Sequence, residues 1–134
     1  AYPYLFSYFK GEEWRTQVLT HQLLQTYFKN SPEGLPGNDD TGTMSAWALF
    51  SMMGFYPDCP GEPAYTLTSP VFDKITLHLD EKQWGRDKLV IETLRSNPNA
   101  VRIEKIEVGG KPWRQYRISH NDLVKAGTLK FTLK

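Results

Sequence analysis

The chain has 134 residues, of which 16 are Lys or Arg and 15 are Asp or Glu, so its formal net charge is only +1. This balance supplies no strong field that would favour nucleic acid or an anionic membrane surface as a partner. A single cysteine, Cys59, excludes an internal disulfide and any cysteine-cluster metal site, and no apolar run approaches the ~20 residues that span a bilayer.

The first part of the sequence predicts helices. Pro3 suits the first turn of a short helix that Gly11 ends, because proline has no N–H to lose there. Apolar residues at helical spacing, with glutamates in the first turn, then predict a packed amphipathic helix from about Glu12 to Phe28. The buried stripe expected for this helix is Trp14, Val18, His21, Leu24 (or Gln25) and Phe28.

A Gly- and Pro-rich loop over residues 30–37 separates that helix from a second one. The second helix is expected from about Thr43 to Met53, with Gly54 at its end. Its expected apolar stripe is Met44, Trp47, Ala48, Leu49, Met52 and Phe55.

From Tyr65 onward the apolar period changes to two, which predicts strands. The expected strands, all antiparallel, cover residues 65–68, 75–79, 89–93, 101–108 and 128–133. Gly109 and Gly110 are expected to close a hairpin, and Ser119 is expected to cap a single helical turn that Gly127 ends. The predicted fold class is therefore α+β, with helices first and an antiparallel sheet or sandwich segment after them.

The candidate for chemistry is the loop Gly37-Asn38-Asp39-Asp40, which sets two adjacent carboxylates just ahead of the second helix. An Asp in this place commonly accepts hydrogen bonds from the first helix amides, so a purely structural cap is one interpretation. Capping and catalysis are compatible, because helix amides and the helix dipole keep a nearby carboxylate ionised. An ionised carboxylate is what a general base must be.

Other polar side chains have structural interpretations. The three histidines are far apart in sequence and share no metal-ligand spacing, which favours core, strand and helix-start roles for His21, His78 and His120. Three glutamates of the first part fit solvated helix-dipole or loop positions rather than a catalytic acid: Glu12, Glu13 and Glu33. Basic residues interspersed with acids in the strand-like part indicate a solvated face: Lys88, Arg95, Arg102, Lys105, Lys111, Arg114 and Arg117.

Several further segments accompany the Asp pair, and from Pro3 to about Lys74 their order and spacing match one enzyme family, with the later segments similar to that family's closing β segment. The loop itself belongs to a longer run, Gly34-Leu35-Pro36-Gly37-Asn38-Asp39-Asp40-Thr41-Gly42-Thr43-Met44-Ser45-Ala46-Trp47. The accompanying segments are Pro3–Phe9, Trp14–Gln17, Gly54–Gly61, Ser69–Lys74, Gly109–Trp113, Ile118–Leu123 and Gly127–Phe131. Together these segments make nearly the whole chain resemble glycoside hydrolase family 92, the calcium-dependent exo-acting α-mannosidases.

The resemblance implies that the chain is a C-terminal fragment of a longer enzyme that has a β-sandwich beside an (α/α)6 barrel. Residues 1–58 would be the helical end of the barrel, with the Asp pair on a loop that lines the cleft, and residues 59–134 an antiparallel β segment. The family implies a secreted, periplasmic or cell-surface location. Because the helices lack their barrel neighbours here, exposed apolar area and self-association are expected.

The resemblance also implies inverting hydrolysis of α-1,2-linked or related mannosides of N-glycans or mannan. In that reaction one carboxylic acid protonates the leaving oxygen while a second carboxylate, about 6.5–9.5 Å away, deprotonates a water. By position Asp40 is expected to be that general base, and Asp39 the assistant or the alternative base. Asn38, whose amide would organise the loop, and Trp47, one helical turn past the motif, are the expected substrate-side residues.

The other catalytic groups of the family are expected to lie outside this chain. The family's general acid is a glutamate well upstream of the motif, so the fragment alone is expected to be inactive. Calcium is expected in the full-length enzyme, and no ligand for it is assigned here beyond a water-mediated contact to Asp40. Trp47 and Trp14 could stack on a sugar, although helical spacing more often indicates core; Trp84 and Trp113 fit packing or surface positions.

A function of another class stays open on the sequence. The chain could be a non-catalytic carbohydrate-binding or structural β-module that its helices cap. Such a module predicts a sheet face with exposed Trp and polar residues and a buried, capping Asp40, whereas a catalytic fragment predicts that Asp40 opens onto a cleft.

Overall fold

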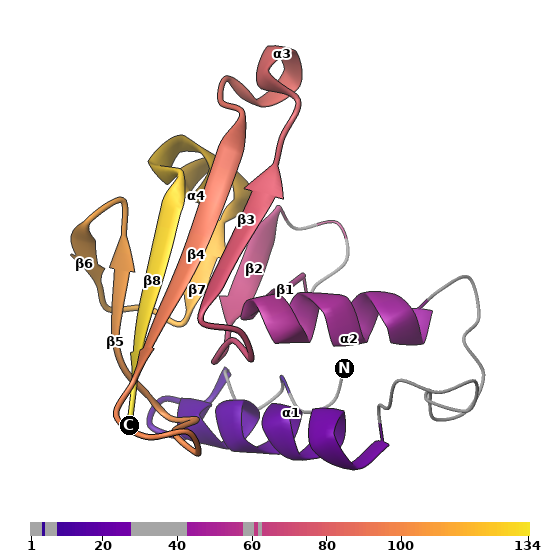
Figure 1. The fold of residues 1–134 in the computed structure, drawn as a ribbon, viewed down its shortest axis with the longest axis vertical. Coiled ribbons are helices and arrows are strands. Elements are labelled where there is room, and N and C mark those ends of the chain that lie inside the picture. The colour runs from indigo at the N-terminus through magenta and orange to yellow at the C-terminus, as the bar shows by residue number, and fades with distance from the viewer. Residues whose placement is uncertain (1–3, 5–7, 28–42, 58–60, 62) are drawn as a thin grey trace.

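A computed structural model describes residues 4, 8–27, 43–57, 61 and 63–134 of the chain. Within these residues two long helices come first, and eight strands with two short helices follow (Figure 1). The α+β fold class that the sequence predicts is confirmed. None of the described helices is both long and apolar enough to cross a membrane.

The two long helices lie close to their predicted positions. Helix α1 spans Glu13–Tyr27 and α2 spans Thr43–Met53. Gly54 follows α2 with φ of 95°, a left-handed conformation that a glycine adopts without a steric cost and that ends a helix. For the expected first helix after Pro3, Tyr4 and Tyr8 have 3-10 geometry, and residues 5–7 lie outside the described part.

The buried face of α1 differs from the expected stripe, because polar residues occupy most of it. Trp14 is 37% exposed, so its expected core position is wrong. The buried positions of α1 are Thr16, Gln17, Thr20, His21 and Leu24. The helix is rotated toward these residues because Gln17 and His21 find backbone hydrogen-bond partners elsewhere in the chain. On α2, the expected burial of Leu49 is likewise wrong, because this side chain is 59% exposed.

The larger sheet has five strands in the order β3-β4-β8-β5-β6 (Figure 1). Their bounds are β3 Lys74–His78, β4 Lys88–Arg95, β5 Ile103–Val108, β6 Lys111–Trp113 and β8 Thr128–Leu133. The prediction that all strands are antiparallel is wrong for one pair, because β4 and β8 are parallel. The carbonyl of Gly127, directly before β8, accepts from Val90 N at 3.0 Å, so β8 begins beside the start of β4 and both strands run the same way.

A second sheet has three short strands in the order β1-β2-β7: Phe55–Tyr56, Ala64–Leu67 and Arg117–Ser119. Two short helices complete the fold. Helix α3 spans Glu81–Trp84, and α4 spans His120–Ala126 with Ser119 as its N-cap and Gly127 as its C-cap, as the sequence predicts. Strands β1 and β7 and helix α3 were not expected, because two to four residues are too few to show a period.

Two hydrophobic clusters hold these elements together. The larger cluster fills the β part, and its most buried members include Ile91, Leu129 and Phe131. Met53 at the end of α2 and Phe55 of β1 belong to this cluster too. The smaller cluster contains Tyr4, Leu24 and Ala48, with Leu23, Met52 and Tyr56 packed against it. The division at residue 58 stays a prediction; β1 pairs with β2 across it.

Candidate active site

The predicted site residues fall mainly outside the described part of the chain. Asn38, Asp39 and Asp40 lie in the interval between residues 27 and 43, of which the structure describes nothing. Trp47 lies on the second turn of α2, but its side chain is not among those described. The roles of these four residues therefore stay predictions, and the described geometry concerns the scaffold that flanks them.

The scaffold consists of α1 and α2, which lie side by side with their loop-bearing ends at the same end of the pair (Figure 1). Leu24 near the end of α1 and Ala48 in α2 belong to one buried cluster with Tyr4, so this cluster joins the two helices there. The Asp pair follows Tyr27 and precedes Thr43 in sequence. The relative position of the two helices therefore fixes both anchor points of the segment that carries the predicted base.

Tyr4 packs between the helices and the start of the β part. Its side chain is 1% exposed, and its hydroxyl oxygen lies 2.7 Å from Ser51 Oγ of α2. The Tyr4 ring stacks on the ring of Tyr56 with centroids 4.7 Å apart and an interplanar angle of 18°. Phe50 meets the Tyr56 ring edge-on at 6.2 Å. Aromatic packing thus attaches α2 to strand β1 on one side.

Residues 68–73, which follow β2, contact both helices; we call them the brace segment. His21 Nε2 of α1 donates to the Ser69 carbonyl at 2.9 Å. The Val71 amide donates to the Met52 carbonyl of α2 at 2.9 Å, and the Thr68 amide donates to the Gly54 carbonyl at 2.8 Å. Because each contact uses the backbone of the brace segment, its path sets where both helices sit.

Burial controls the charge state of His21. Desolvation lowers the pKa of the His21 imidazole, with the hydrogen bond to Ser69 acting in the opposite direction and the positive charge of Arg95 adding to the lowering. The neutral imidazole with its proton on Nε2 satisfies the Ser69 carbonyl. The interface between α1 and the brace segment therefore favours a neutral histidine.

The remaining histidines and the first-turn glutamates keep the structural roles expected of them. His78 is an exposed residue of β3, and His120 opens α4 with its Nδ1 2.7 Å from the hydroxyl of Tyr65. Glu12 pairs with Arg15 at 2.7 Å, and Glu13 accepts from the Gly11 amide at 2.8 Å. Within the described ranges, no three His, Cys, Asp or Glu side chains gather in a way that could hold a metal ion.

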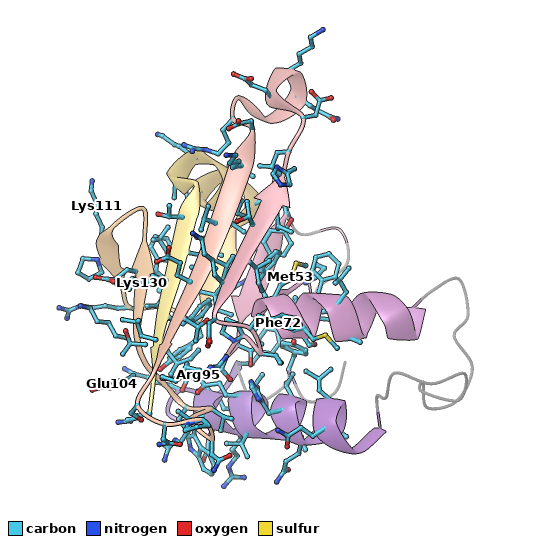
Figure 2. The ribbon with its side chains drawn as sticks, viewed as in Figure 1. Met53, Phe72, Arg95, Glu104, Lys111 and Lys130 are labelled. Carbon is cyan, nitrogen blue, oxygen red and sulfur yellow. The ribbon has the colours of Figure 1, made fainter. Side chains whose placement is uncertain are left out.

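Arg95 is the residue that the sequence interpretation missed. It was expected on a solvated face, yet its side chain is only 14% exposed and lies where the sheet meets the helices (Figure 2). Its guanidinium donates to the carbonyls of Pro70 and Val71 at 2.9 and 2.7 Å and to that of Ala100 at 3.3 Å. A lone Arg at the end of a strand gives no sequence signal for such contacts.

Comparison with known proteins gives a consistent result. Residues 1–134 match the family model for the glycosyl hydrolase family 92 catalytic domain. An uncharacterized secreted glycosidase from Arthroderma benhamiae is 30% identical over 114 residues, which are 84% of this chain and 14% of that protein.

Two solved structures from Bacteroides thetaiotaomicron resemble this chain. One is a family GH92 α-mannosidase in complex with mannoimidazole, at 28% identity, with TM-score 0.86 over 98% of this chain and 17% of that chain. The other is a family GH92 inverting mannosidase, at 32% identity, with TM-score 0.85 over 99% of this chain and 17% of that chain. The chain thus spans less than a fifth of the length of each of these three relatives.

Proposed function

The chain belongs to glycosyl hydrolase family 92, and on this premise we propose that it is the C-terminal part of an inverting, exo-acting α-mannosidase. The observation that carries the proposal is the family match over residues 1–134, within which the Asp39-Asp40 pair stands immediately before α2. Structures of a mannosidase that binds mannoimidazole and of an inverting mannosidase are among the relatives, which supports mannose-containing glycans as the substrate class.

In the proposed reaction Asp40 is the general base. It accepts a proton from a water that attacks the anomeric carbon, while a carboxylic acid from another part of the parent protonates the leaving oxygen. Asp40 precedes Thr43, the first residue of α2, by three positions. The free amides at the start of that helix favour an ionised carboxylate nearby, as a base requires. Asp39 is the alternative base, and Asn38 and Trp47 are proposed to contact the substrate.

Calcium is proposed as the cofactor of the full-length enzyme. The described residues hold no group of three His, Cys, Asp or Glu side chains that would fit such an ion, so no ligand is assigned among them and no step of the reaction is derived through calcium. A hard cation would take oxygen ligands, which other parts of the parent are proposed to supply, with Asp40 contacting the ion through a water.

The substrates are proposed to be α-1,2-linked or related mannosides of N-glycans or mannan, and the parent is proposed to act outside the cytoplasm. The name of one relative, a secreted glycosidase, supports that location. Because the proposed acid lies in another part of the parent, we propose that the fragment by itself has no activity.

The alternative interpretation, that the chain is a carbohydrate-binding β-module, has less support. It needs an open aromatic platform on a sheet, but Trp113 of β6 is only half-exposed and donates its indole N–H to the Arg117 carbonyl at 3.0 Å. The more exposed Trp14 lies on α1 rather than on a sheet, with the guanidinium of Arg102 4.9 Å from its ring centre.

The proposal is tested by supplying the full-length parent with α-1,2-mannobiose in the presence of calcium and following the first product by proton NMR. An inverting α-mannosidase releases β-mannose first, and α-1,3- and α-1,6-mannobiose compared in parallel establish the linkage preference. Chelation of calcium is expected to abolish turnover and its re-addition to restore it. Release of α-mannose first, or no release from any of the three disaccharides, would contradict the proposal.

A further inference from the structure

We propose that Arg95 is a positioning residue for the predicted general base, acting through the brace segment and the two helices that flank the Asp pair. The proposal rests on the proposed function, and it concerns a residue that lies on β4, remote in sequence from the Asp pair. Four observations carry the proposal: the contacts of Arg95, the two anchors of α1, the attachment of α2, and the burial of the Arg95 guanidinium.

The Arg95 guanidinium joins two stretches of backbone. Both donors on the brace side come from Nη2, which contacts the carbonyls of Pro70 and Val71 at 2.9 and 2.7 Å. Nη1 contacts the carbonyl of Ala100, in the connection between β4 and β5, at 3.3 Å. The planar, rigid guanidinium presents these donors in a fixed geometry, so it sets the distance between the two stretches.

One anchor of α1 lies on the brace segment, and the other lies directly after the connection between β4 and β5. His21 Nε2 donates to the Ser69 carbonyl of the brace segment at 2.9 Å. Gln17 Oε1, one turn earlier, accepts from the Ile103 amide at 2.7 Å, just after the connection that Arg95 binds. The buried face of α1 is mostly polar, so directional hydrogen bonds hold it. These bonds fix the rotation of the helix about its axis and its position along that axis more strictly than apolar contact would.

Helix α2 is attached to the brace segment at its C-terminal end. The Val71 amide, next to the carbonyl that Arg95 binds, donates to the Met52 carbonyl at 2.9 Å. Gly54, which ends α2, packs so closely on Pro70 that an added Cβ would lie 2.6 Å from Pro70 Cγ. A shift of the brace segment must therefore move α2 as well as α1.

Burial decides which Arg95 contacts matter. Its ion pair with Asp73 at 3.0 Å involves a carboxylate that is 83% exposed, and exposed pairs of this kind contribute little. The guanidinium itself is only 14% exposed, and its contacts to the carbonyls of Pro70 and Ala100 are partly buried, so their loss leaves two poorly solvated acceptors unpaired, whereas the contact to Val71 is exposed. Figure 2 shows Arg95 at the end of the sheet nearest the helices.

The experiment compares Arg95→Gln and Arg95→Lys with a matched control, Arg86→Gln, in the full-length parent. Arg86 also donates to a backbone carbonyl, that of Lys125 at 2.8 Å, but it follows α3 and binds the end of α4, at the end of the sheet away from α1 and α2 (Figure 1). Two readouts are taken below the melting temperature of every variant. They are kcat and KM on α-1,2-mannobiose and hydrogen exchange of the α1 and α2 amides.

Arg95→Gln is expected to lower kcat by about tenfold or more with KM within about twofold, because a displaced base weakens the chemical step rather than ground-state binding. Arg95→Lys keeps the positive charge but can make fewer of the hydrogen bonds. Its kcat should therefore lie between those of wild type and Arg95→Gln. Exchange of the α1 and α2 amides should accelerate in Arg95→Gln while β8 keeps its protection. Arg86→Gln should leave both readouts at wild-type values.

The proposal is overturned if Arg95→Gln keeps kcat within about twofold of wild type, or if Arg86→Gln lowers kcat equally. The failure of the proposed function is separate, because it would appear as a wild-type parent that hydrolyses no α-mannoside. In that event the catalytic part of the inference falls with the proposed function, and the exchange readout decides only whether Arg95 holds α1 and α2 in place. Unchanged exchange of α1 and α2 in Arg95→Gln then overturns this structural part too, and selective acceleration supports it.

Discussion

His21 Nε2 contacts the carbonyl oxygen of Ser69 at 2.9 Å, across 48 residues of sequence. The contact joins the helix that precedes the Asp pair to the segment that follows strand β2. Because Arg95 binds the next two carbonyls of that segment, the helical and β parts meet through a polar, directional interface. Such an interface depends on protonation, on backbone geometry and on the presence of each donor.

Stability should fall as the pH drops below the usual histidine range. Burial lowers the pKa of His21 below 6.5, so from pH 6.5 downward the unfolded chain binds a proton that the folded chain does not. The contribution of His21 is therefore complete above pH 6.5 and is lost as the pH falls through the folded-state pKa. Urea unfolding at a series of pH values between 7.5 and 5 measures this loss.

His21→Gln is the informative variant in that series, because glutamine can still donate to the Ser69 carbonyl but does not titrate. It should flatten the fall in the free energy of unfolding below pH 6.5. His78→Gln, at an exposed position of β3, should keep the wild-type slope. An unaltered slope in His21→Gln would show that other groups cause the acid sensitivity.

Gly54→Ala should destabilise the fold more than Gly110→Ala. Both glycines have positive φ, 95° and 82°, so each substitution carries a left-handed penalty of about 1–2 kcal/mol. Only at Gly54 does the new Cβ also meet Pro70 Cγ at 2.6 Å and the Thr68 carbonyl at 3.0 Å, whereas nothing lies within 4 Å at Gly110. Overpacking should add about 1–3 kcal/mol at Gly54. Equal losses in denaturant midpoint at constant slope would contradict this account.

Ser119→Ala should cost about 1 kcal/mol of stability, because the Ser119 hydroxyl accepts from the Asp122 amide at 3.1 Å and caps α4. Ser119→Thr keeps an oxygen in the same place and should cost only a few tenths of that. Thermal unfolding of the two variants beside wild type provides the measurement. A threonine variant as unstable as the alanine variant would point to a role other than capping.

The isolated chain is expected to self-associate through the exposed apolar side chains of its helices and of the brace segment, rather than through those of the sheet. Leu49 on α2 and Phe72 in the brace segment are 59% and 52% exposed. Sedimentation velocity should show concentration-dependent association that Leu49→Glu weakens. Leu94→Glu, at a 54% exposed position of β4, is the matched control and should have little effect. A clean monomer with little dye-accessible apolar surface would refute the expectation.

The sequence predicted best the elements whose signals are local. The end of α2 was found because Gly54 follows an apolar helical run, and α4 because Ser119 and Gly127 bracket it at capping distance. Strand β8 was placed correctly in sequence, but its parallel pairing with β4 was not, because pairing direction depends on where the intervening elements return the chain.

The scaffold around the predicted site could not be found from local patterns. The buried face of α1 carries Thr16, Gln17 and Thr20, which a hydrophobic period cannot identify. Arg95 resembles any solvent-facing strand-end arginine until the fold brings the Pro70, Val71 and Ala100 carbonyls around it. Asp39 and Asp40 are outside the described residues, so the roles proposed for them rest on the sequence motif and the family.

The assignment of Asp40 as general base is tested most directly in the full-length parent with calcium, by measuring mannose release from α-1,2-mannobiose. Asp40→Asn is compared with wild type and with Asp39→Asn, after circular dichroism has established that all three are folded. Asp40→Asn should lower kcat by about 10²–10⁴, and Asp39→Asn by less. Activity of Asp40→Asn within a few-fold of wild type would contradict the account and leave Asp40 as a helix cap, with Asp39 the next candidate for the base.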